Sequence, residues 1–188
     1  MNKNLDLEFK ISELTQTSKD DPTHFKGDIK IYDKDTSKNI GALSYNKFTY
    51  KIYIDHVWVD EEYRGKSLCP KMFAILIDKF PDIQIFMLAN YGGISACKCY
   101  IKSFINKNFD VFIGGGLFDY EYMRNNNMTI KQQFNIHINH TRNNLRKKNN
   151  TKNNTKNNTQ KNTQKNTINS LCSKYGDAAD MDFLFLRK

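Results

Sequence analysis

Two helical segments alternate with three short apolar runs in the middle of the chain, and this alternation constrains the fold more than any other feature of the sequence. The runs at residues 50–60, 83–89 and 109–115 are rich in β-branched and aromatic residues, as strands are. Residues 67–80 and 94–108 place apolar residues three and four positions apart, as helices with one buried face do. Because a helix that crosses between neighbouring strands leaves them parallel, the sequence predicts parallel pairing in this region.

The N-terminal part of the chain has the pattern of an antiparallel sheet. Residues 5–14, 24–33 and 40–46 alternate apolar and polar side chains, with no helical segment between them. The order of all these segments along the chain predicts a mixed α/β fold with a mostly antiparallel central sheet and flanking helices. Two segments compete for the last strand: a short loop favours residues 117–124, whereas the apolar alternation of residues 180–188 favours the chain's end, which we prefer.

The net charge of +9 belongs to one segment of the chain. Eleven of the 29 Lys and Arg residues lie between Tyr122 and Gly176, a range without Asp or Glu, so the rest carries 18 basic and 20 acidic residues. Within it, residues 143–170 repeat Asn, Thr, Lys and Gln with almost no apolar side chains, which predicts disorder. The segment is interpreted as a tolerated surface expansion, the alternative being a weak nonspecific tether to nucleic acid.

This composition divides the chain into three parts. Residues 1–124 form the expected folded domain, residues 125–179 the low-complexity insert, and residues 180–188 the candidate final strand. The chain starts without the apolar run of a signal peptide, and no stretch reaches the roughly 18 apolar residues of a membrane span. The sequence therefore predicts an intracellular, cytoplasmic protein with no membrane contact.

The four cysteines show neither the density of a disulfide scaffold nor the spacing of a zinc site. Cys69, Cys97, Cys99 and Cys172 include no Cys-x-x-Cys pair. We therefore expect free thiols and no metal.

A basic turn follows the longest apolar run. Arg64, Gly65 and Lys66 stand where the strand at 50–60 gives way to the helix at 67–80. The first N–H groups of a helix lack intrahelical partners and attract anions. Only one glycine is present, so the stretch is either an anion cradle with substitutions or a basic turn that precedes an ordinary core helix. We favour the cradle.

The stretch YIDHVWVDEEYRGKSLCPKMFAILID, followed by a strand and ACKCYIKSFINKNFDV, resembles the GNAT superfamily of acyl-CoA-dependent N-acyltransferases. The family's signature, Arg/Gln-x-x-Gly-x-Gly/Ala at the start of a helix, binds the pyrophosphate of coenzyme A. Its six positions here are Arg64, Gly65, Lys66, Ser67, Leu68 and Cys69. Ser67 and Cys69 replace the two signature glycines, and both are small. The resemblance implies splayed parallel strands in the middle of the sheet and acetyl-CoA as co-substrate.

The resemblance also assigns roles on the strand before the cradle. The backbone of Val57, Trp58 and Val59 would bind the pantetheine arm and the thioester carbonyl. Asp55 matches the carboxylate that serves as general base, although a strand-edge carboxylate that only faces water is the alternative.

The general acid in many relatives is a tyrosine about five residues before the next strand. That position here is Phe104, which has no proton to donate, and Tyr100 lies one turn earlier on the same helix face. Tyr100 is therefore the candidate acid, with a buried core tyrosine as the alternative. The predicted function is N-acetylation of a primary amine on a small molecule or protein. The alternative is a catalytically inactive module that binds coenzyme A or has a regulatory role.

Overall fold

The computed structural model describes residues 5–17, 19, 21–89, 93–115, 168–173 and 181–188. These residues form two compact units. The first unit contains the described residues up to Leu88 together with Arg187, and the second contains those from Ala89 to Leu186 together with Lys188.

The first unit is built on a mixed sheet, as the sequence predicts. Its strands are β1 (Leu7–Ile11), β2 (Thr15–Gln16), β3 (Phe25–Asp33), β4 (Lys38–Lys47), β5 (Lys51–Val59) and β6 (Ile85–Ala89). They follow the order β1-β3-β4-β5-β6, with β2 paired to β3. Neighbours from β1 to β5 are antiparallel, whereas β5 and β6 are parallel. The prediction of an antiparallel sheet that turns parallel after the strand at residues 50–60 is confirmed.

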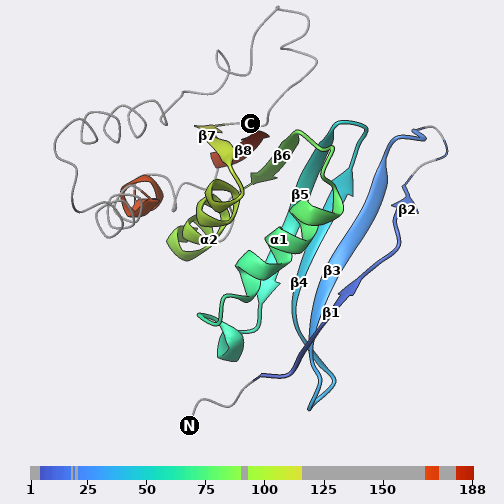
Figure 1. Ribbon diagram of the computed structural model, residues 1–188, viewed down its shortest axis with the longest axis vertical. Coiled ribbons are helices and arrows are strands. Elements are labelled where there is room, and N and C mark those ends of the chain that lie inside the picture. Colours follow the sequence, from blue (N-terminus) through green and yellow to red (C-terminus); the bar gives the residue numbers. More distant parts are fainter. Residues whose placement is uncertain (1–4, 18, 20, 90–92, 116–167, 174–180) are drawn as a thin grey trace, which may run out of the picture. The chain divides into compact units, whose positions relative to one another are not determined.

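Helix α1 (Leu68–Lys79) joins the two parallel strands and packs against β4 and β5 (Figure 1). Its buried face consists of Leu68, Met72, Phe73, Leu76 and Ile77. The facing strands contribute fully buried side chains such as Leu43 and Ile54. Because each such side chain stabilises the fold by roughly 1.5–3 kcal/mol, this layer fixes the position of the helix start on the sheet.

Arg187 closes the C-terminal end of α1. Its guanidinium donates to the carbonyl oxygens of Phe80 at 3.3 Å and Ile77 at 3.5 Å, and its Nε donates to that of Ile83 at 3.1 Å. The last carbonyls of a helix lack intrahelical donors, and a cation there also complements the helix dipole. Arg187 therefore ties the end of the chain to the helix that begins at the basic turn.

The second unit contains α2 (Gly93–Asn106), β7 (Phe109–Gly115), β8 (Met181–Arg187) and a short helix at residues 168–173. Asn108, with φ 65°, ends α2 in the left-handed conformation that asparagine tolerates. Strand β8 is the neighbour of β7 in the sheet. The ring of Phe104 stacks on Phe185 of β8 with centroids 3.8 Å apart. The competing segment 117–124 and the low-complexity tract 143–170 lie outside the described residues.

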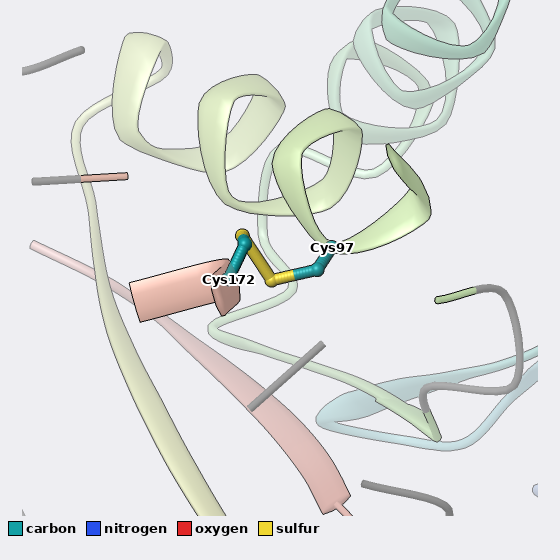
Figure 2. The surroundings of a disulfide bond; sticks show 2 residues. All are labelled: Cys97 and Cys172. Atoms are coloured by element: carbon teal, nitrogen blue, oxygen red, sulfur yellow. A yellow bond between two sulfur atoms is a disulfide. The ribbon is translucent and has the colours of Figure 1, made fainter. Parts of the chain in front are cut away.

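The prediction of free thiols is wrong. No cysteine in the described part of the chain is free, and Cys97 of α2 forms a disulfide with Cys172 of the short helix (Figure 2). Their Cα atoms are 5.6 Å apart, a separation that a disulfide spans without backbone movement. The two cysteines are 75 residues apart across the polar tract, so no local spacing indicates the pairing.

Candidate active site

The chain passes from β5 to α1 through a turn with two left-handed residues. A single 3-10 turn, η1 (Glu61–Tyr63), comes first, and then Gly65 with φ 77° and Ser67 with φ 60°. A Cβ placed on Gly65 would meet no atom within 4 Å, so the space beside its backbone is open. Turns of this kind form backbone concavities that bind anions.

Four consecutive backbone N–H groups at this turn are available to a ligand. Among the described residues, no hydrogen-bond acceptor faces the N–H groups of Gly65, Lys66, Ser67 or Leu68. Ser67 is the N-cap of α1, but its hydroxyl makes no capping hydrogen bond. Pro70, which has no N–H, occupies the third helical position, in the first turn, where proline is tolerated. We call residues 64–69 the cradle.

Two basic side chains flank the cradle, and both are exposed. Arg64 donates from Nε to the carbonyl oxygen of Val59 at 3.2 Å, and its Nη1 lies 3.7 Å from Glu61 Oε1. Lys66 Nζ lies 4.7 Å from the centre of the Tyr63 ring. The pair with Glu61 is solvent-exposed on both sides and contributes little, so Arg64 can turn toward an anion.

Side chains of η1 anchor the cradle to the sheet. Tyr63 Oη donates to Asp33 Oδ2 at 2.7 Å, and Asp60 pairs with Lys38 at 2.7 Å while its own N–H donates to Ile40. The hydrogen bond from Tyr63 holds the pKa of the Asp33 carboxyl below its usual range, and the same bond raises the pKa of Tyr63 to about 12. These contacts fix the turn on β3 and β4.

The edge of β5 that leads into the cradle is open toward β6. Pairing between the two strands begins at Lys51 and ends at Ile54, opposite Leu88, whereas β5 continues to Val59. On the other side Val57 and Trp58 still pair with β4. In the described part of the chain β5 and β6 are therefore unpaired beside residues 55–59. An extended ligand could form hydrogen bonds with this backbone, which is where the family resemblance implies the pantetheine arm.

Asp55 lies at a bulge in β5 and is exposed. The register passes from Ser44 opposite His56 to Tyr45 opposite Ile54, so Asp55 has no partner residue on β4. Partial burial of the carboxyl group raises its pKa, an effect larger than the opposing pull of Lys26 and of the hydrogen bond from Asn46. A carboxylate with a raised pKa is a better proton acceptor than an ordinary aspartate.

Asn46, which no sequence motif singles out, is the hydrogen-bond partner of Asp55. Its Nδ2 donates to Asp55 Oδ2 at 2.5 Å, and its Oδ1 lies 2.8 Å from His24 Nε2. The alternation of each strand could have placed Asn46 on the same face as residue 55. The register between β4 and β5, and with it the bulge at Asp55, has no marker in the sequence.

Tyr100 belongs to the second unit. It is 5% exposed and packs edge-on against Phe183 of β8, with ring centroids 6.2 Å apart. Burial raises the pKa of Tyr100 to about 12. The phenol is therefore protonated at physiological pH, as a general acid must be, and its packing also fits the alternative of a core tyrosine.

Ser67 occupies a backbone conformation that favours glycine, and glycine is what the signature has at that position. We expect Ser67→Gly to raise the free energy of unfolding by about 1 kcal/mol, since a left-handed residue with a Cβ is strained by about that amount. Urea denaturation measures the change. The matched control is Ser44→Gly in β4, which should destabilise because glycine weakens a strand. An equal decrease in the free energy of unfolding in both variants would contradict the strain at Ser67.

Comparison with known proteins gives similarity at the level of solved structures alone. No family model and no curated relative matches the chain. An acetyltransferase from Bacillus cereus is 15% identical over 48% of this chain and 63% of its own, with a TM-score of 0.39. The diaminobutyrate acetyltransferase from Paenibacillus lautus, in complex with L-2,4-diaminobutyric acid and coenzyme A, is 9% identical over 47% and 56%, with a TM-score of 0.43. Nourseothricin acetyltransferase is 12% identical over 61% and 89%, with a TM-score of 0.41.

The first two of these structures are matched over less than two thirds of their length. The functional assignment therefore rests on the residues of the chain itself. None of the helices in the described residues is long and apolar enough to cross a membrane. The described residues also contain no cluster of three potential metal ligands.

Proposed function

We propose that the protein is an N-acetyltransferase that uses acetyl-CoA and acts on a primary amine of a small molecule or a protein. The observation that carries this proposal is the cradle: four available N–H groups between an open strand edge and a helix start, flanked by Arg64 and Lys66. Unpaired N–H groups at a helix start bind phosphate groups, and the helix dipole adds to the attraction.

The residues present fit a coenzyme A molecule. Gly65 leaves room beside its backbone, so the N–H groups of residues 65–68 would hold the diphosphate, with Arg64 and Lys66 supplying positive charge. The backbone of Val57, Trp58 and Val59 would hold the extended arm along the unpaired part of β5. When bound, acetyl-CoA supplies a thioester as the acetyl donor.

Each proposed catalytic residue has one proton to handle. Asp55 accepts a proton from the attacking amine as the C–N bond forms, directly or through water. Tyr100 donates its phenolic proton to the sulfur that leaves as the C–S bond breaks. Asp55 must be ionised to act. Because its pKa is raised, the carboxylate becomes protonated earlier as the pH is lowered, so activity should begin to fall at a higher pH than with an ordinary aspartate.

The test is release of free thiol from acetyl-CoA in the presence of a panel of peptides, polyamines and aminoglycosides. Wild type should release thiol with at least one class of amine. Tyr100→Phe should lower kcat on the order of 100-fold without changing the affinity for coenzyme A, because the hydroxyl acts only as the sulfur leaves. Asp55→Asn should also lower kcat, and its deficit relative to wild type should shrink as the pH falls toward the raised pKa of Asp55, because the wild-type carboxylate then becomes protonated.

The outcomes separate the proposed function from its alternative. Full activity of Tyr100→Phe beside an impaired Asp55→Asn would assign the acid to water or to another group. Tight binding of coenzyme A with no acetylation of any amine would favour the inactive module, for which Phe104 at the usual tyrosine position is the specific observation. If coenzyme A does not bind, both the acetyltransferase and the inactive module would be excluded.

A further inference from the structure

We infer that Asn46 and His24 are positioning residues for Asp55, which they hold in one orientation through a chain of two hydrogen bonds. The inference rests on the proposed function in that Asp55 is taken as the general base. The chain runs from His24, just before β3, through Asn46 on β4 to Asp55 on β5. All three residues belong to the first unit.

Asp55, the third member, lies two residues after Tyr53, the partner of Asn46 on β4, so the alternation of β5 puts Asp55 on the face of Asn46. Asp55 has no partner residue on β4, and its carboxylate accepts a hydrogen bond from the side chain of Asn46. Bulges recur beside active sites, where they re-aim one side chain while the strand continues. A regular strand would place the Asp55 carboxylate differently relative to the open edge.

The chemistry of the three groups fixes the direction of both hydrogen bonds. An ionised carboxylate only accepts, so the Nδ2 amide group of Asn46 must face Asp55. The Oδ1 of Asn46 then faces His24 and accepts from the protonated Nε2 of the ring. Oδ2 of Asp55 is thereby occupied, and among the described residues no donor faces Oδ1, which is left for the amine proton.

His24 is itself held on two sides. Its ring stacks on Phe48 with centroids 4.5 Å apart and planes 16° from parallel. Its carbonyl oxygen accepts from both the N–H and the hydroxyl of Thr17, each at 3.0 Å. A donor fixed in this way fixes the amide plane of Asn46, as outer partners orient the residues that carry out chemistry.

The charged groups that face Asp55 come from elements other than its own strand. Lys26 of β3 and His24 both lower the pKa of Asp55, as does the hydrogen bond from Asn46, against the larger effect of burial. Removal of the Asn46 amide should therefore raise the pKa of Asp55 further. The pH dependence of turnover is thus a readout that a merely structural role for Asn46 would not move.

The experiment uses two matched pairs of variants in the full chain. Asn46→Leu removes the central amide, and Asn39→Leu, at the other end of β4, is its control. His24→Phe keeps a ring against Phe48 but removes the donor, whereas His24→Gln keeps an N–H at a similar reach. We expect Asn46→Leu and His24→Phe to lower kcat about 10- to 100-fold with unchanged affinity for coenzyme A, and His24→Gln to restore most of the loss.

A second readout does not depend on turnover. The pKa of the Asp55 carboxyl, followed by carbon-detected NMR, should rise in Asn46→Leu and stay unchanged in Asn39→Leu, and the acidic limb of the pH–rate profile should move the same way. An unchanged Asp55 pKa in Asn46→Leu would overturn the inference, whether or not the wild type acetylates an amine. If the Asp55 pKa rises in Asn46→Leu but the wild type acetylates no amine, the hydrogen-bond chain would stand and the proposed function would be excluded.

Discussion

Replacing Gly65 with Asp is expected to abolish binding of coenzyme A. The substitution puts a carboxylate beside the N–H groups that would hold the diphosphate, in a space where a Cβ meets no protein atom. Two like charges about 4 Å apart near a protein surface repel by up to about 4 kcal/mol, and 1.4 kcal/mol is a tenfold change in affinity. Isothermal titration with coenzyme A should therefore show a loss of at least about 100-fold.

The matched control is Gly65→Asn, which adds a side chain of the same size without the charge. Asn and Asp are among the residues that best tolerate the left-handed conformation at this position, so both variants should fold and differ mainly in charge. We expect the Asn variant to retain measurable binding. Wild-type affinity in Gly65→Asp would show that the diphosphate does not lie at the cradle, and an equal loss in both variants would show that space, not charge, decides binding.

Loss of the disulfide between Cys97 and Cys172 is expected to destabilise the fold strongly. The bond closes a loop of 75 residues, and cross-linking a loop of this length lowers the entropy of the unfolded chain by an amount equivalent to about 4 kcal/mol. Cys97→Ala/Cys172→Ala should therefore lower the free energy of unfolding by about that amount, measured by urea denaturation under non-reducing conditions.

Each single substitution is the control for the double one. Either Cys97→Ala or Cys172→Ala removes the same bond, so the double variant should be only slightly less stable than each single variant. Additive losses would mean that the two side chains stabilise the fold through separate packing contacts. A free Cys172 in the wild type, found by non-reducing peptide mapping, would contradict the pairing itself.

The regular elements could be predicted because their residues carry the pattern locally. Helix α1 was expected at 67–80 and is found at Leu68–Lys79, between the strand that ends in Val59 and the one that begins at Ile85. The position of the basic turn between a strand and a helix start could be predicted in the same way, whereas its role as a diphosphate site stays a prediction. Ser67 has a positive φ, a backbone conformation that favours glycine.

What the sequence could not provide depends on contacts between distant residues. The bulge at Asp55 arises from the register between β4 and β5, and the hydrogen bonds through Asn46 to His24 require three elements to be in place. The disulfide could not be predicted for the same reason, because its two cysteines meet only after α2 and the short helix have packed. The free-thiol prediction assumed that spacing alone would reveal a pair.

The most direct test of the cradle is an amide NMR titration of the nitrogen-labelled wild type with coenzyme A. The resonances of Gly65, Lys66, Ser67 and Leu68 should shift together and saturate at one affinity, because their N–H groups acquire acceptors that the protein does not supply. Pantetheine, which lacks the diphosphate, should shift residues 57–59 and leave these four unchanged. Saturable binding of coenzyme A that leaves the four amides unmoved would contradict the assignment of the cradle as the diphosphate site.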